Sequence, residues 1–215
     1  MLNRLTLALP GADWRRDACQ DAPRRPAGLA AREDAGDAEL MAWAGAGDRA
    51  AFDILVERHA ERVLRLALRV LGDAAEAEDV AQDAFLRAWQ AAPRFDPGRA
   101  RFTTWLHRIV LNLAIDHARR RGRLPPAGLD AAKDLPDPAK GPEARLSEAE
   151  GREALVAALD ALPPRQRAAI ALAYEEGLSG AAAAEALSVS ERALEGLLRR
   201  ARQMLRARLD PGGKR

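Results

Sequence analysis

One stretch decides how this chain folds: RFTTWLHRIVLNLAIDHARRRGR, residues 101–123. Apolar side chains recur in it at three- and four-residue spacing, which predicts a helix with one buried face. These side chains are Phe102, Trp105, Leu106, Ile109, Val110 and Leu113. Thr103 or Thr104 can cap the start of the helix, and Gly122 followed by Pro125 can end it.

The opposite face of this predicted helix is basic. Arg108, Asn112 and Asp116 follow one another at one-turn intervals, and Arg119 continues the same side. Between Arg99 and Arg123 the chain carries seven arginines but a single acidic residue. Like charges this close repel one another, and a bound polyanion relieves the repulsion. The stretch therefore indicates contact with nucleic acid.

Composition sets the outer limits. The chain has 215 residues and a formal net charge of +2, with aromatic residues at only 4%. We expect thin all-α cores built from Leu, Val and Ala. The single cysteine, Cys19, excludes an internal disulfide framework and a Cys-rich zinc site, and we expect no metal and no cofactor. No run approaches the roughly 20 apolar residues that span a bilayer, which favours a cytoplasmic protein.

Breaks in periodicity divide the chain into two helical modules. Proline, glycine and acidic residues crowd the stretch between them, which is typical of a semi-rigid linker. The predicted segments are a disordered extension 1–36, a first module 37–123, a linker 124–145, a second module 146–209 and a tail 210–215.

In the first module, Asp48 can cap a long helix with one apolar face. His59 lies on that apolar face without a second ligand at metal spacing, which indicates a packed histidine. His107 and His117 stand among arginines, so we expect them to face DNA or solvent.

Gly72 can end the long helix, and Asp73 can cap the next one, which runs to about Ala91. This second helix carries five acids and one arginine, and two interpretations stay open. The face is either a solvated surface with early acids that favour the helix dipole, or a docking surface for a basic protein. Its outward polar residues are Glu76, Asp79, Gln82, Asp83 and Arg87.

A turn-rich connector, PRFDPG at residues 93–98, leads into the basic helix. Phe95 and Arg99 in and beside this connector would lie near Trp105 and Asn112, where they could form a pocket for an unstacked base. The alternative is that Phe95, Phe102 and Trp105 are anchors of the core.

The second module ends in a helix-turn-helix pattern. A helix marked by Leu155, Val156, Leu159 and Leu162 stops at Pro163, and a second runs from Gln166 to Glu176. After Gly177 a short alanine-rich helix ends at Leu187. Ser190 then caps a last helix, Glu191 to about Leu209. In this pattern the short helix braces a longer basic one across a major groove. The outward arginines are Arg192, Arg199, Arg200, Arg202, Arg206 and Arg208.

Together these segments resemble the extracytoplasmic-function (ECF) sigma factors, small two-domain bacterial transcription initiation factors. The most specific resemblance is D-x-x-Q-D-x-F, at residues 79–85, followed by W-L-x-x-I-x-x-N-x-x-x-D, at residues 105–116. The resemblance covers residues 37 to about 209. It implies a region 2 helical bundle and a region 4 helix-turn-helix, with no catalytic residues and no small-molecule substrate.

The resemblance also implies roles for residues. The helix from Asp73 would dock on the clamp helices of the RNA polymerase largest subunit, through Glu76, Asp79, Gln82, Asp83, Phe85 and Arg87. The −10 element would be read and opened by Phe95, Arg99, Arg101, Thr104, Trp105, Arg108, Asn112, Arg119, Arg120 and Arg121. The −35 element would be read by Ser190, Glu191, Arg192, Glu195, Arg199, Arg200 and Arg202. Further implied partners are the polymerase flap and a cognate anti-sigma factor, which in many members is anchored in the membrane.

Some positions depart from the family pattern. Gly180, Ala181 and Ala182 stand where an aromatic residue and two acids are common, and Ser188 stands where a glycine is usual. Glu195 replaces a residue that is often basic. It would repel phosphate, but its carboxylate can accept a hydrogen bond from a cytosine amino group.

Two other functions compete with this one. A stand-alone helix-turn-helix regulator would bind duplex DNA but would not need the acidic helix 73–91. A sigma-mimic adaptor that binds only a protein partner would tolerate loss of the arginines at 119–121 and 199–202. An enzyme is disfavoured, because no paired ligand motif, phosphate-binding glycine loop or nucleophile elbow occurs in the sequence.

Overall fold

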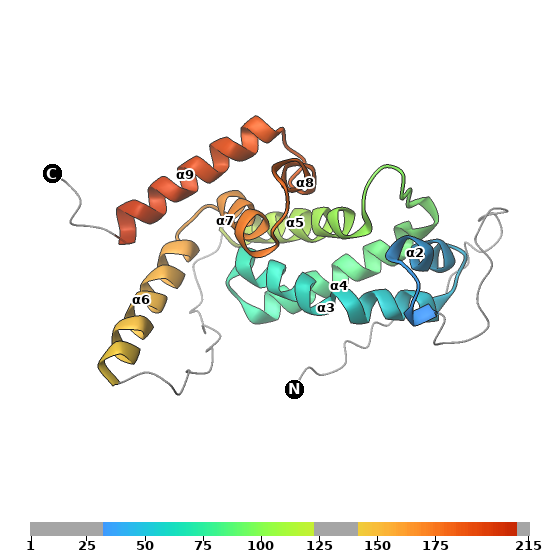
Figure 1. Cartoon of the computed structure of the whole chain (residues 1–215), viewed down its shortest axis with the longest axis horizontal. Helices are drawn as coiled ribbons and strands as arrows, with labels where there is room; N and C mark the ends of the chain where they lie inside the picture. Colours follow the sequence, from blue (N-terminus) through green and yellow to red (C-terminus); the bar gives the residue numbers. More distant parts are fainter. Residues whose placement is uncertain (1–31, 123–141, 210–215) are drawn as a thin grey trace. The chain divides into compact units, whose positions relative to one another are not determined.

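A computed structural model describes residues 32–122 and 142–209, with side chains in the second range from Gly151 onward. Within these ranges every regular element is helical, as the composition predicted (Figure 1). The predicted extension up to Ala31, the linker from Arg123 to Gly141 and the tail lie outside the described residues.

The helices fall into two compact units. The first unit holds most of four helices, and the second holds the remaining four together with Leu68–Ala74 and the part of α5 from Ile115. The first group of elements is α2 (Asp37–Gly45), α3 (Arg49–Leu71), α4 (Ala74–Ala91), the 3₁₀ turn η1 (Ala92–Arg94) and α5 (Phe102–Arg121). The second group is α6 (Pro142–Asp160), α7 (Pro164–Ile170), the π-helical segment η2 (Ala171–Glu175), α8 (Gly180–Ala186) and α9 (Glu191–Leu209).

Local signals set the ends of α3 as predicted. The Asp48 carboxylate accepts a hydrogen bond from the backbone N–H of Ala51 at 3.3 Å, so Asp48 caps the helix. Gly72 follows the last residue of α3 with φ of 72°, a left-handed conformation that glycine adopts without steric cost.

The predicted cap of α5, at Thr103 or Thr104, was wrong by two or three residues. The helix begins at Phe102, and the N–H of Trp105 already donates to the carbonyl of Arg101 at 3.0 Å. Thr103 and Thr104 therefore lie inside the first turn and do not cap it. Phe102 is only 4% exposed, and its burial accounts for the earlier start.

An aromatic core joins α3 to α4. The Phe52 ring lies edge-on to Phe85 and Trp89, with centroid distances of 6.5 and 5.2 Å. At the end of α2, a Cβ on Gly45 would lie 2.9 Å from the carbonyl oxygen of Ala92, so only glycine permits this close approach between α2 and η1.

The helix-turn-helix is present where the sequence predicted it. The Ser179 and Ser190 hydroxyls accept hydrogen bonds from the third N–H of α8 and α9, at 3.3 and 3.2 Å. The turn between these helices passes through Ser188, which has φ of 54°. Helix α9 packs against α6, α7 and α8 and buries Leu194 and Ala201.

Two helices differ in detail from the prediction. The helix predicted over Gln166–Glu176 changes from α-helical to π-helical at Ala171, and Gly177 ends it with φ of 60°. On α6, Leu155 and Val156, which marked the predicted helix, are 41% and 37% exposed. Of the α6 side chains that the structure describes, from Gly151 onward, Ala158 is 2% exposed, as is Leu162 just after the helix, so this end of α6 meets the core.

Candidate nucleic-acid and partner interfaces

Three aromatic side chains form a cluster where the connector meets α5. Phe95 and Trp105 have ring centroids 5.1 Å apart, and each lies 6.0 Å from Phe102. Phe102 is buried, whereas Phe95 and Trp105 are half-buried. Both sequence interpretations therefore apply in part: Phe102 is a core anchor, and the other two rings present partly open surface. We call Phe95, Phe102 and Trp105 the aromatic cluster.

The connector before this cluster is shaped by its own sequence. The Asp96 carboxylate accepts a hydrogen bond from the N–H of Gly98 at 2.9 Å, which is the pattern of an Asx turn. Asp96 also pairs with Arg99 at 3.4 Å. The Arg99 side chain is nevertheless 87% exposed, so its guanidinium remains open to a phosphate.

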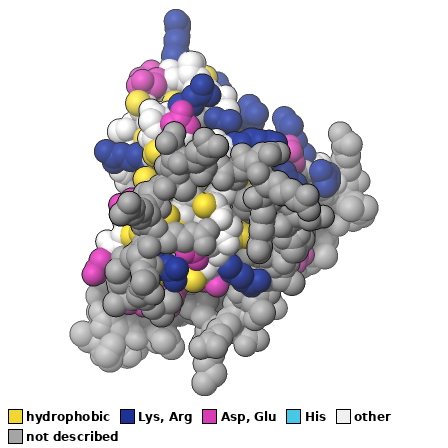
Figure 2. Space-filling model, turned by 90° about the vertical axis from the view of Figure 1, so that its right-hand side faces the viewer, with side chains coloured by type: hydrophobic (Ala, Val, Ile, Leu, Met, Phe, Trp, Pro, Cys, Tyr) yellow, Lys and Arg dark blue, Asp and Glu magenta, His cyan; other side chains and the backbone are white. Residues whose placement is uncertain are grey.

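Exposed basic and polar side chains continue from the connector along α5. Arg101, Arg108 and Asn112 are exposed, and Arg108 and Asn112 lie one turn apart. At the end of the helix Arg119 and Arg120 are exposed, and Arg121 is half-buried. Figure 2 shows Lys and Arg side chains lying among acidic and neutral ones on one face of the molecule. The described residues thus include an aromatic platform followed by cations, an arrangement suited to single-stranded nucleic acid.

Thr104 differs from its predicted role. Its side chain is 5% exposed, because it points to the core side of the first turn of α5. Direct contact with DNA is therefore not available to it in this structure.

Helix α4 turns its acids outward and buries Ala77, Ala81, Ala84 and Ala88. Asp79 and Gln82 are exposed, and Glu76 and Asp83 are half-buried. Asp83 forms an ion pair with exposed Arg87 at 3.1 Å, one turn further along.

Phe85 was predicted to belong to the docking surface on α4. Its side chain is 0% exposed and packs on Phe52, so it supports that surface from below and presents no atoms to a partner.

The start of α9 presents a mixed-charge face. Arg192, Glu195 and Arg199 are exposed at three- and four-residue spacing, so they share one side of the helix. Arg200 and Arg202 are exposed as well.

Two residues at the start of α9 that were predicted to read the −35 element, Ser190 and Glu191, also stabilise the helix-turn-helix. The Ser190 hydroxyl accepts the hydrogen bond that caps the helix. The Glu191 carboxylate lies 3.8 Å from the point where Gly180 would carry a Cβ, and so near the start of α8. Its negative charge there favours the dipole of that helix.

One of the two histidines on buried helix faces was predicted correctly, and the other was not. His59 is 8% exposed, as expected of a packed histidine. His107 is 2% exposed, so the expectation that it faces DNA or solvent was wrong. Burial, together with the nearby charges of Arg62 and His59, lowers the pKa of His107 to about 4. The signal was available, because His107 shares helical spacing with buried Val110 and Leu111.

Sequence reasoning missed a polar network at the start of the first unit. Ala35, two residues before the predicted boundary at Asp37, is 8% exposed, and its carbonyl accepts a hydrogen bond from Arg58 at 2.8 Å. These residues lie 23 positions apart, beyond the reach of any local periodic signal.

Two classes of feature are absent from the described ranges. Among the side chains that the structure describes, at 32–122 and 151–209, no group of three or more His, Cys, Asp or Glu residues could hold a metal ion. None of the helices described is long and apolar enough to cross a membrane.

Comparisons with known proteins agree with this geometry. Residues 55–124 match the model of Sigma-70 region 2, and residues 152–205 match that of Sigma-70, region 4. The first match spans the acidic helix, the aromatic cluster and α5, and the second spans the helix-turn-helix.

Curated relatives narrow the class. The chain is 40% identical to the ECF RNA polymerase sigma factor SigE of Mycolicibacterium smegmatis over 74% of its length, and this match spans 63% of that relative. It is 38% identical to the ECF sigma factor SigM of Mycobacterium tuberculosis, over 83% of this chain and 87% of the relative. The chain therefore belongs to the sigma-70 family and, within it, to the ECF sigma factors.

Two solved structures share the architecture. CnrH, in complex with the cytosolic domain of CnrY, is 32% identical with a TM-score of 0.59, over 82% of this chain and 99% of CnrH. RpoE of Bartonella quintana, in complex with the anti-sigma factor NepR, is 22% identical with a TM-score of 0.57, which shows a common fold. It covers 76% of this chain and 98% of RpoE.

Proposed function

We propose that this chain binds the RNA polymerase core and directs transcription to promoters by reading their −10 and −35 elements. The observation that carries the proposal is the pairing of two different DNA-binding devices in one chain. The aromatic cluster with its cations suits an unstacked strand, and the helix-turn-helix suits a duplex major groove. A stand-alone regulator would need only the second device.

The −10 contacts fall to the connector and α5, and the −35 contacts to α9. We assign the −10 contacts to Phe95, Arg99, Arg101, Trp105, Arg108, Asn112, Arg119, Arg120 and Arg121. We assign the −35 contacts to Arg192, Glu195, Arg199, Arg200 and Arg202, with Ser190 and Glu191 orienting the start of α9. Capture of a flipped base by the half-buried rings would offset the few kcal/mol that unstacking costs.

Docking on the polymerase core falls to the outer face of α4. The exposed or half-buried groups Glu76, Asp79, Gln82, Asp83 and Arg87 would meet a basic partner surface. The chain itself would perform no catalysis, because the polymerase supplies the chemistry. We place its work in the cytoplasm, where polymerase and promoters are found.

We also propose a cognate anti-sigma factor as a partner. The CnrH structure contains the cytosolic domain of CnrY. By analogy, a protein that covers the DNA-binding surfaces of this chain would hold it inactive. Co-purification of the full chain with candidate anti-sigma domains, followed by loss of transcription in their presence, tests this.

Promoter-directed transcription tests the main proposal. Purified bacterial core polymerase and the full chain are incubated with DNA randomised at the −35 and −10 positions. Selective runoff transcripts are expected. Duplex binding without transcripts would favour a stand-alone regulator, and binding of neither DNA nor core would favour an adaptor.

Two variants separate the steps. Asp79→Lys with Asp83→Lys should abolish core binding but leave duplex binding intact. Glu57→Lys, on the exposed face of α3, is the control for reversing a charge elsewhere on the first unit. Replacement of Arg119, Arg120 and Arg121 by alanine should keep core binding but lower promoter opening. If Glu57→Lys also abolishes core binding, the assignment of the docking face to α4 fails.

A further inference from the structure

An N-terminal strap, residues Arg32–Gly36, is fastened to the first unit by polar contacts. Arg32 forms an ion pair with buried Asp48 at 3.0 Å, across the turn that precedes α3. From α3, Arg58 donates hydrogen bonds to the carbonyls of Glu33 and Ala35. The strap delivers the chain to Asp37, the first residue of α2.

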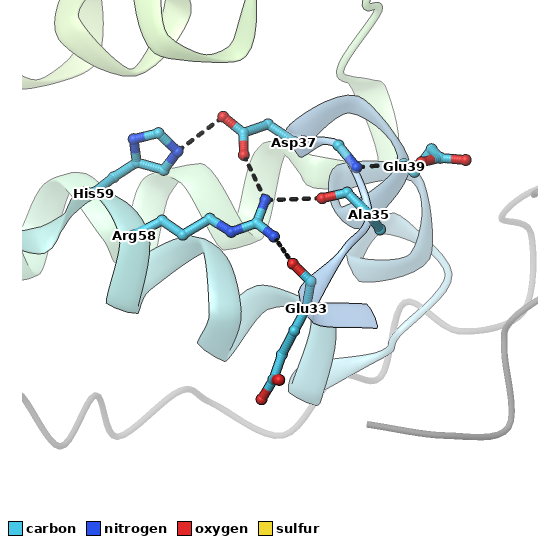
Figure 3. A network of polar contacts seen from close by, with 7 residues as sticks. Glu33, Ala35, Asp37, Glu39, Arg58 and His59 are labelled. Atoms are coloured by element: carbon cyan, nitrogen blue, oxygen red, sulfur yellow. Dashed lines mark hydrogen bonds and ion pairs between the residues drawn. The ribbon is translucent and has the colours of Figure 1, made fainter. Parts of the chain in front are cut away.

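Asp37 is bound from two sides by neighbouring residues of α3 (Figure 3). One carboxylate oxygen accepts a hydrogen bond from Arg58 at 3.2 Å, and the other lies 2.8 Å from Nε2 of His59. The hydrogen bond with His59 is the largest influence on the carboxyl group and lowers the pKa of Asp37 below its ordinary 3.8. At neutral pH the carboxylate is therefore ionised and fixes the plane of the imidazole ring.

The other side of His59 touches the aromatic cluster. The His59 ring lies edge-on to Phe102, with centroids 5.2 Å apart and an interplanar angle of 63°. Phe102 in turn contacts both half-buried rings of the cluster, Phe95 and Trp105, at 6.0 Å. A continuous series of contacts thus runs from the strap to the surface proposed to capture a base.

We propose that Asp37 and His59 are positioning residues for the aromatic cluster. They orient Phe102, which holds the two outer rings in the arrangement that receives an unstacked promoter base. The physical reason is preorganisation: rings that are only half-buried would otherwise lose conformational freedom when the base binds, and that loss would weaken capture. This inference rests on the proposed function of the cluster.

Arg58 provides the natural comparison. It holds the strap and the same Asp37 carboxylate, whereas the ring contact with the cluster is made by His59. A purely structural network would make Arg58 and His59 equivalent. A positioning role makes them different, because the ring that touches Phe102 belongs to His59.

Promoter opening by holoenzyme tests the proposal. Core polymerase with the full chain is mixed with promoter DNA that carries 2-aminopurine in the non-template −10 strand, and its fluorescence reports unstacking. His59→Gln keeps a donor for Asp37 but loses the ring, and we expect it to lower the opening equilibrium about 2- to 12-fold, the worth of one aromatic contact. His59→Phe keeps the ring and should retain more opening than His59→Gln.

The Asp37 variants and the Arg58 control complete the design. Asp37→Ala should lower opening, and Asp37→Asn should restore it, because the amide oxygen still accepts from His59. Arg58→Ala should lower the unfolding temperature but leave opening by the folded chain unchanged. All variants should bind core and −35 duplex DNA as wild type does.

The outcomes separate the two proposals. If wild-type holoenzyme opens no promoter, the proposed function itself fails. If wild type opens the promoter and His59→Gln opens it equally well, only the positioning role fails. Equal losses in Arg58→Ala and His59→Gln would also overturn it, since both would then act through stability alone. Should His59→Gln fail to fold, the comparison of Asp37→Ala with Asp37→Asn decides.

Discussion

At the scale of single residues, we propose that Glu195 contributes to promoter choice. It is exposed between Arg192 and Arg199 on α9, and its carboxylate can only accept hydrogen bonds. A cytosine amino group offers the matching donor in the major groove. The flanking arginines would supply the attraction to phosphate that a lone acid lacks.

Exchange of Glu195 for glutamine should therefore change the preferred base. Glutamine pairs with adenine at its N6 and N7 atoms, so Glu195→Gln should shift preference at one −35 position from cytosine toward adenine by about 1–3 kcal/mol. Selection from randomised −35 duplexes measures the shift. Glu185→Gln, on the exposed side of α8, is the control. An unchanged selected sequence would show that Glu195 reads no base.

His107 predicts a pH dependence of folding. Burial lowers its pKa from 6.5 to about 4, so the unfolded chain binds more protons than the folded chain between these values. Stability from this residue is complete above pH 6.5 and is lost as the pH falls toward 4, by up to about 3 kcal/mol. Asp37, whose pKa is also lowered, adds a loss in the same direction below its ordinary value.

Urea unfolding at pH 7 and pH 4.5 measures this dependence. The free energy of unfolding should fall at the lower pH, and His107→Gln should reduce the fall because it removes the titrating group. Identical pH slopes for wild type and His107→Gln would contradict the assignment.

At the scale of elements, the contact between α2 and η1 depends on one glycine. A Cβ on Gly45 would lie 2.9 Å from the Ala92 carbonyl oxygen and 3.2 Å from Cα of Pro93, and backbone atoms cannot move aside cheaply. Gly45→Ala should therefore destabilise the first unit by about 1–3 kcal/mol in thermal or urea unfolding.

Gly151→Ala on α6 is the matched control. Nothing lies within 4 Å of its added Cβ, so we expect a gain of about 0.5–1 kcal/mol from helix propensity. If Gly45→Ala were as stable as wild type, the close approach of α2 and η1 would not be a constraint on the fold.

The elements also show what sequence can predict. As expected, Asp48 caps the start of α3 and Gly72 ends it. Both signals were readable because caps depend on atoms within three or four residues. Thr103 did not follow expectation, since burial by a partner element decides the first turn of α5. The Asp37–His59 contact joins residues 22 positions apart, and a single sequence carries no signal of it.

The candidate site residues likewise divide into those predicted from local spacing and those whose burial the sequence did not reveal. Exposed Arg108 and Asn112 were found from helical spacing, because outward faces repeat regularly. Glu195 was singled out because it departs from the family pattern. Thr104 and Phe85 were assigned from resemblance to surfaces, but their side chains are buried. A family motif marks positions whose side chains matter, and it does not separate contact from support.

At the scale of the whole molecule, the net charge is small, but positive and negative side chains are concentrated on different helices. The net charge is only +2, yet exposed arginines cluster on α5 and α9 while acids occupy α4. Binding to duplex DNA should therefore respond to local clusters and not to net charge.

Salt dependence of duplex binding tests this view. The logarithm of the binding constant should fall linearly with that of salt concentration, and each phosphate-contacting arginine changed to alanine should reduce the slope by about 1. Arg199→Ala and Arg202→Ala are the variants to measure. Arg65→Ala on α3, which pairs with Glu61, should leave the slope unchanged. Equal slopes for all of these chains would exclude Arg199 and Arg202 as phosphate contacts.

Ser188 carries a consequence for how this sequence can drift. It turns the chain between α8 and α9 at φ of 54°, where a side chain with a Cβ is disfavoured and glycine is not. Substitutions of Ser188 by glycine, asparagine or aspartate should therefore be tolerated during evolution, whereas valine and isoleucine should be rejected. A single substitution, Ser188→Gly, could therefore raise the stability of the second unit without altering any side chain that we propose to contact DNA.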